Sequence, residues 1–140
     1  MPVARQDVIR RAALLVVALF WVILVRLSLG LFSMKFIRRM LLPTPAVSRP
    51  DLDPASVVWA VRRAASAVPF ASCLTQALAA QIMLARRRCP TTLHVGVKRD
   101  VNGTFGAHAW LESNGRLLLG GTRASLKSFV RLAVFPSADE

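Results

Sequence analysis

Apolar residues dominate the first third of the chain. Residues 12–25 contain no charged side chain, Arg26 interrupts the run, and residues 27–34 continue it with only two serines and one glycine. A bilayer span needs about 20 apolar residues, so the uninterrupted run is too short, whereas residues 12–32 suffice if Arg26 is tolerated. We expect residues 12–34 to be helical and to pack on the core or dock a partner protein, with membrane association as the alternative.

The residues around this segment bear on its location. Basic side chains flank the run on both sides, so the positive-inside rule selects neither orientation. No small-residue cleavage site follows the run, which argues against a cleaved signal peptide. We expect a cytoplasmic protein, in which residues 12–34 are the part that would contact the inner face of the cell membrane.

Prolines divide the chain into two predicted regions. Residues 43–50 contain three prolines and are expected to link a basic, apolar helical region over residues 1–42 to a domain over residues 51–140. Asp53 followed by Pro54 is typical of a helix start, because aspartate can cap and proline suits the first turn. A second helix is expected to begin at Cys73 with Ser72 as its N-cap.

The pattern changes to that of strands after the second helix. Residues 91–97 are β-branched and alternating, and residues 105–111 follow after an Asn102-Gly103 turn, which predicts a hairpin packed on the helix that begins at Cys73. Residues 125–134 are expected to add a final strand or a short helix. The chain is therefore predicted to have an α+β fold with an antiparallel sheet.

Composition narrows the class of protein. The formal net charge of +12 favours an acidic partner or an anionic surface, but no nucleic-acid-binding signature and no nucleotide motif is present, so no nucleic acid and no cofactor is expected. The two cysteines and two histidines lack the paired spacing of a zinc site or a disulfide framework. They are Cys73, Cys89, His94 and His108.

Cys73 and His108 are the candidates for catalysis. A cysteine at a helix N-terminus lies beside unpaired N–H groups and the positive end of the helix dipole, which favours the thiolate. His108, near the middle of the second hairpin strand, would be its general base. By themselves, such residues are more often a small core cysteine and a structural histidine.

Residues 52–121 resemble the stand-alone transglutaminase-like cysteine peptidases that remove the leader from lasso peptide precursors. The resemblance implies a transglutaminase-like or papain-like peptidase fold, with Cys73 as nucleophile and His108 as base. It also implies three partners, namely a precursor peptide, a separate leader-binding protein, and an ATP-dependent lasso cyclase that closes the macrolactam. It is carried by Cys73-Leu74 opening an Ala/Leu helix, Arg86-Arg87-Arg88, Leu93-His94-Val95-Gly96-Val97, and Ala107-His108-Ala109-Trp110-Leu111-Glu112 followed by Asn114-Gly115.

The third catalytic residue is left open, because the family pattern has an aspartate on the strand after the histidine and residues 116–121 contain no carboxylate. Glu112 is the nearest candidate, since it lies four residues beyond His108 on the same strand face. Asn114 or a backbone carbonyl are the others, and a Cys-His dyad is also compatible.

Other groups complete the expected site. The backbone N–H of Cys73 is the expected oxyanion donor, and Gln76 and Gln81 are less suited because polar residues in a helix body are usually exposed. Trp110 would wall the site or belong to the core. The rival to an enzyme is a basic, membrane-associated binding or scaffold protein without catalysis.

Overall fold

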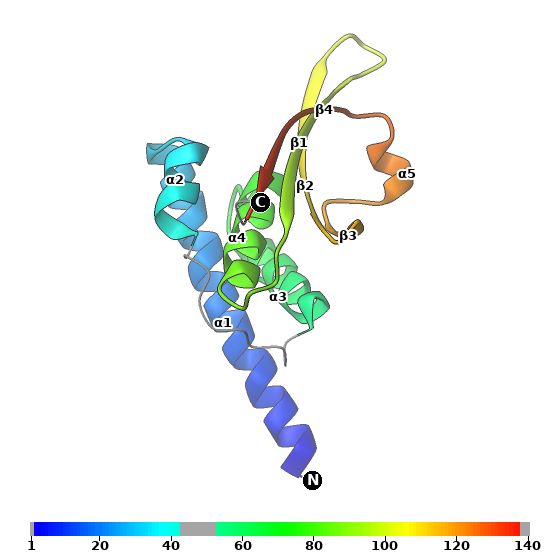
Figure 1. Cartoon of the computed structure of the whole chain (residues 1–140). Helices are drawn as coiled ribbons and strands as arrows, with labels where there is room; N and C mark the ends of the chain where they lie inside the picture. Colours follow the sequence, from blue (N-terminus) through cyan, green and yellow to red (C-terminus); the bar gives the residue numbers. More distant parts are fainter. Residues whose placement is uncertain (1, 43–52, 138–140) are drawn as a thin grey trace.

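The computed structural model describes residues 2–42 and 53–137 and places four helices on one side of a four-stranded sheet (Figure 1). This arrangement confirms the predicted α+β class. The linker expected over residues 43–50 lies outside the described residues. The elements are α1 (Pro2–Leu31), α2 (Met34–Leu41), α3 (Pro54–Ala67), α4 (Cys73–Ala85), β1 (Thr92–Arg99), β2 (Phe105–Ser113), β3 (Arg116–Leu119), α5 (Arg123–Leu126) and β4 (Val130–Pro136).

The two predicted helix starts are present, and each is fixed by a capping side chain. The Asp53 carboxylate accepts a hydrogen bond from the Ala55 N–H at 3.3 Å, and Pro54 opens α3. Ser72 Oγ accepts from the Thr75 N–H at 3.2 Å, so α4 begins at Cys73. Such caps satisfy backbone donors that the first helical turn leaves unpaired.

The predicted hairpin is β1 and β2, and it forms the middle of a sheet ordered β3-β2-β1-β4 with antiparallel neighbours. Gly103 turns the chain between the two strands with a φ of 79°. The C-terminal segment supplies both elements that were considered for it, the short helix α5 and the strand β4.

The two faces of the hairpin are covered by different parts of the chain. Side chains alternate along a strand, and on one face Leu93, Ala109 and Leu111 are buried in the core with α4. The other face carries His94 and Trp110. Trp110 is 3% exposed and contacts Phe129, with the ring centroids 6.4 Å apart. The segment between β3 and β4 therefore covers this second face.

The α1 helix is part of the same packed unit. Its middle section contacts α3 and α4, while residues 3–13 are all exposed. The separate helical region predicted over residues 1–42 thus contributes directly to the hydrophobic core. The α1 residues buried there are Leu14, Ala18, Trp21, Val22 and Val25.

Candidate active site

Cys73 is the first residue of α4, and its half-buried thiol is free. The Ser72 carbonyl and hydroxyl accept hydrogen bonds from the N–H groups of Gln76 and Thr75. As the first residue of α4, Cys73 has an N–H group that finds no acceptor within its own helix. This donor is therefore available to a negatively charged oxygen beside the sulfur.

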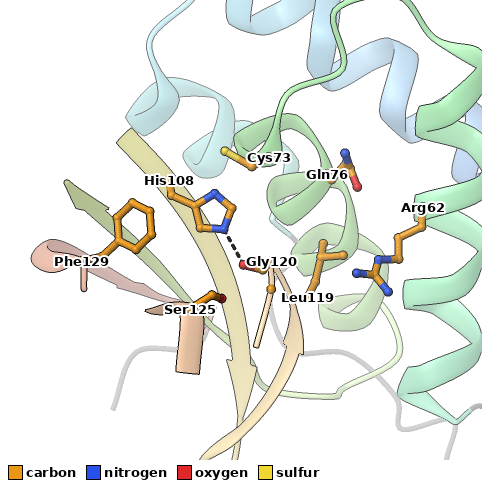
Figure 2. A pocket seen from close by; sticks show the side chains of 9 residues that line it. Arg62, Cys73, Gln76, His108, Leu119, Gly120, Ser125 and Phe129 are labelled. Atoms are coloured by element: carbon orange, nitrogen blue, oxygen red, sulfur yellow. Dashed lines mark hydrogen bonds between the residues drawn. The ribbon is translucent and has the colours of Figure 1, made fainter. Parts of the chain in front are cut away.

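His108 projects from β2 toward Cys73. Its Nε2 is hydrogen-bonded to the carbonyl oxygen of Gly120, and Figure 2 shows the other ring nitrogen on the side that faces Cys73. A carbonyl can only accept, so the proton lies on Nε2 and Nδ1 is the free acceptor. The imidazole is further held by Phe129, with ring centroids 5.4 Å apart. His108 is thus oriented with its basic nitrogen toward the thiol.

Gly120 lies directly after β3 and has a φ of 110°, which side chains rarely permit. A Cβ there would lie 2.6 Å from Cβ of Trp110, so the position is also sterically closed. Gly121 follows with a φ of 120°. These two glycines allow the chain to bring a carbonyl oxygen to the imidazole directly after β3, the strand on which the resemblance leads us to expect an aspartate.

Glu112 occupies a different place from the one expected for a third catalytic residue. Its carboxylate lies 3.3 Å from Nε2 of His94. Four residues of β-strand separate it from His108 by about 13 Å, which a glutamate side chain does not bridge. The structure therefore brings Glu112 to His94 and not to His108, while Asn114 forms the β2–β3 turn with a φ of 51°.

The neighbour of Glu112 is a buried histidine. His94 is 5% exposed, and its ring stacks on that of Trp110 with centroids 5.4 Å apart. Burial lowers the pKa of His94 below its ordinary value, with Arg131 acting in the same direction and Glu112 opposing it. Trp110 is consequently packed between His94 and His108 on the face of the hairpin that Phe129 covers.

A cavity of about 440 Å³ opens between Cys73 and His108. It lies at the edge of β2 that β3 leaves free, since β3 pairs only with the last residues of β2, Leu111–Ser113. Arg62 of α3 contributes an exposed guanidinium group to one wall (Figure 2). The lining residues are Arg62, Cys73, Gln76, His108, Leu119, Gly120, Gly121, Ser125 and Phe129.

A comparison of the chain with models of known protein families gave one match that identifies its family. The family model described as the transglutaminase-like superfamily matches residues 19–134, well over half of the chain. The chain belongs to the transglutaminase-like superfamily. Members of this superfamily are often cysteine-type enzymes, and cysteine peptidases are among them. No curated protein and no solved structure gave a significant match.

The transglutaminase-like match includes Cys73, His108 and Gly120, together with α1 from Leu19 onward. The described residues contain no group of three or more His, Cys, Asp or Glu side chains arranged to hold a metal ion. Cys89 lies apart from the cavity, with its sulfur 3.9 Å from the hydroxyl of Ser113. Of the four residues considered as zinc ligands, Cys73 and His108 line the cavity. Cys89 lies beside Ser113, and His94 lies beside Glu112.

The two glutamines of α4 have different surroundings in the transglutaminase-like domain. Gln76 lines the cavity one turn after Cys73. Gln81 is fully buried, so the expectation of exposure was wrong for it. Its amide donates to the Phe135 carbonyl at 3.0 Å and accepts from Arg38 at 3.3 Å, which joins α4 to β4 and α2. These partners explain why a polar side chain is tolerated in the core.

Nothing in the sequence indicated that several of these residues would line the cavity of the transglutaminase-like domain. Arg62, Ser125 and Phe129 come from segments without a recognisable motif. The Gly120-Gly121 pair did carry a signal, since adjacent glycines after a strand often mark positive φ angles. That signal identifies a special backbone conformation but not the atom that it presents.

Proposed function

We propose that this protein is a cysteine peptidase that removes the leader from a ribosomally made lasso peptide precursor, before a separate ATP-dependent cyclase closes the macrolactam. The observation that carries the proposal is the cavity in which Cys73 faces His108, while Nε2 of His108 is held by Gly120. Superfamily membership supports thiol chemistry. The resemblance of residues 52–121 to lasso leader peptidases supports the choice of substrate.

The cavity geometry suggests the following route for peptide cleavage. Nδ1 of His108 takes the thiol proton, and the Cys73 thiolate attacks the scissile carbonyl to form a C–S bond. The resulting oxyanion lies beside the N–H of Cys73, which stabilises the developing charge. The imidazolium then protonates the leaving amine as the C–N bond breaks, leaving a thioester on Cys73.

Water completes the cycle. His108 accepts a proton from a water molecule as its oxygen attacks the thioester, and the proton returns to the sulfur when the C–S bond breaks. The products are the leader carboxylate and the freed amine of the core peptide. An amine in place of water would give transfer by the same steps.

In this proposal the Gly120 carbonyl fixes the ring and tautomer of His108. A carboxylate would do the same and would also stabilise the imidazolium by its negative charge. A neutral carbonyl supplies only its dipole. We therefore expect orientation, and not charge compensation, to be the main contribution of the third group.

The proposed partners follow from the resemblance and from charge. A separate leader-binding protein would present the precursor, and the net charge of +12 would attract an acidic leader or carrier. Both cysteines are free thiols, as in a reducing cytoplasm. We propose a cytoplasmic location in which the apolar α1 helix brings the peptidase to the inner face of the membrane.

The deciding experiment is mass spectrometry of a precursor peptide incubated with its leader-binding partner and this protein. Intact protein and Cys73→Ala are compared, with Cys89→Ala as the matched control because Cys89 lies outside the cavity. We expect a leader fragment with the intact protein and with Cys89→Ala, and none with Cys73→Ala. The mass of the fragment distinguishes hydrolysis from transfer to an amine.

A binding or scaffold protein would give a different result. In that case Cys73 would resist iodoacetamide at neutral pH, and Cys73→Ala would retain the function. If the partner binds the precursor and the intact protein still leaves it uncut, the peptidase proposal fails for that substrate.

A further inference from the structure

A continuous apolar stripe runs along the uncovered face of α1. Its members recur at intervals of three, four or seven residues, which places them on one side of a helix. All are substantially exposed, although every one is a large hydrophobic residue. They are Ile9 (59% exposed), Val16 (68%), Phe20 (57%), Ile23 (41%), Leu27 (62%) and Leu31 (79%), and we call this set the α1 stripe.

The opposite face of α1 is already occupied. Ala18, Val22 and Val25 are completely buried against α3 and α4. Only 28% of the most apolar 18-residue window of the helix is buried, and no charged side chain falls between residues 12 and 25. Between residues 12 and 25 the helix is therefore apolar on all sides but covered on only one.

The packed face decides how α1 can meet a membrane. If α1 crossed the bilayer, the parts of α3 and α4 that pack on its middle section would enter the hydrocarbon with it. Arg62 and Arg63, both exposed on α3, would be carried toward that region at a high energetic cost. A helix lying in the plane of the interface avoids this cost, because its free face enters the lipid while the packed face keeps its contacts.

The residues beside the stripe favour lipid over a partner helix. A helix-helix seam in water is usually flanked by charged side chains, whereas Ala12, Val17, Leu19 and Leu24 flank the α1 stripe. The apolar surface of α1 is therefore wider than the α1 stripe alone, and a wide apolar surface suits contact with the hydrocarbon of a bilayer.

Charge complementarity identifies the kind of lipid surface. Arg5 and Arg10 are exposed near one end of the stripe, and Lys35 and Arg39 of α2 are exposed near the other. Basic residues at a membrane surface attract anionic headgroups. The apolar surface also continues onto α2 through exposed Phe36.

We propose that α1 and α2 form an in-plane anchor for an anionic lipid bilayer, with the α1 stripe embedded at the interface. The anchor does not require the chemistry at Cys73. It therefore stands or falls independently of the peptidase function.

Flotation of the full-length protein with vesicles tests the anchor. One set of vesicles contains phosphatidylcholine alone, and the other contains phosphatidylcholine with phosphatidylglycerol. We compare wild type, Ile23→Asp, Leu27→Asp and the matched control Val101→Asp, whose side chain is fully exposed in the β1–β2 turn. Circular dichroism of each variant verifies that the fold is retained, and Phe20→Ser is a milder substitution in the same stripe.

We expect wild type, Val101→Asp and Cys73→Ala to float with the anionic vesicles and to be released by salt or alkaline carbonate. Each stripe variant should bind about tenfold or more weakly, since a large apolar side chain no longer enters the lipid. Equal binding by the stripe variants would overturn the proposal. Vesicle binding that resists alkaline carbonate would also overturn it, because such binding indicates a spanning helix. So would failure of the wild type to float together with a dimer that Ile23→Asp dissociates, because the α1 stripe would then be a protein interface.

Discussion

At the scale of single residues, Gly120 controls the position of the atom that orients His108. Its φ of 110° and the 2.6 Å approach of any Cβ to Trp110 leave no room for another residue without movement of the chain. Movement of this segment displaces the carbonyl oxygen from Nε2. The effect of a substitution here should therefore appear in catalysis.

We predict that Gly120→Ala lowers kcat of the proposed leader cleavage on the order of 100-fold, because His108 loses its fixed tautomer and direction. Gly103→Ala is the matched control, since its φ of 79° is also positive but no atom lies within 4 Å of the added methyl group. Single-turnover cleavage assays compare the two. Equal losses in both variants would assign the effect to general backbone strain.

His94 gives a second prediction at this scale, concerning pH. Burial holds its pKa below the ordinary value of 6.5, so the unfolded chain binds this proton more readily than the folded protein does. The stability due to a neutral His94 is complete above about pH 6.5 and declines as pH falls from there toward the lowered folded-state pKa. Glu112 and Arg131 are the charged neighbours that set the size of the effect.

We therefore predict that His94→Gln loses less stability than wild type between about pH 7 and about pH 5. Urea unfolding of both proteins across this range measures the difference. A parallel decline in the two proteins would show that His94 does not contribute to acid sensitivity.

At the scale of elements, α1 has two sections with different roles. Residues 3–13 are exposed, whereas the section from Leu14 to Val25 supplies side chains to the core shared with α3 and α4. Removal of a large buried side chain typically costs about 2–5 kcal/mol, against a total stability of about 5–15 kcal/mol. The second section is therefore required for folding.

We predict that deletion of residues 2–10 leaves thermal unfolding nearly unchanged, whereas deletion of residues 2–25 abolishes cooperative unfolding. Circular dichroism during heating measures both. A fragment of residues 51–140 that unfolds cooperatively would contradict this, and would support the independent peptidase domain predicted from the sequence.

The elements also show which sequence signals were informative. The starts of α3 and α4 and the β1–β2 hairpin depend on local capping and turn residues, so they were predicted correctly. The four-residue strand β3 has no alternating pattern. The pairing of β4 with β1 joins segments about 40 residues apart, and no local signal specifies such a partner.

At the scale of the whole molecule, the site depends on tertiary packing. Cys73 and His108 were identified from their chemistry and from a resemblance, and the fold brings both to one cavity. Glu112, one of the candidates for the third residue, lies against His94. Strand spacing places it about 13 Å from His108, although the two residues share a face. A backbone carbonyl was only one of several candidates, and the sequence did not indicate that Gly120 would supply it, since no side chain marks a backbone oxygen.

An orienting group that belongs to the main chain has a consequence for genetics. Every amino acid has a main-chain carbonyl group, so a substitution at position 120 cannot remove the functional oxygen and can only misplace it. A saturation screen of this gene should then show no sensitive acidic position in the third role. Intolerance should fall instead on Gly120 and on Trp110, the side chain against which it packs.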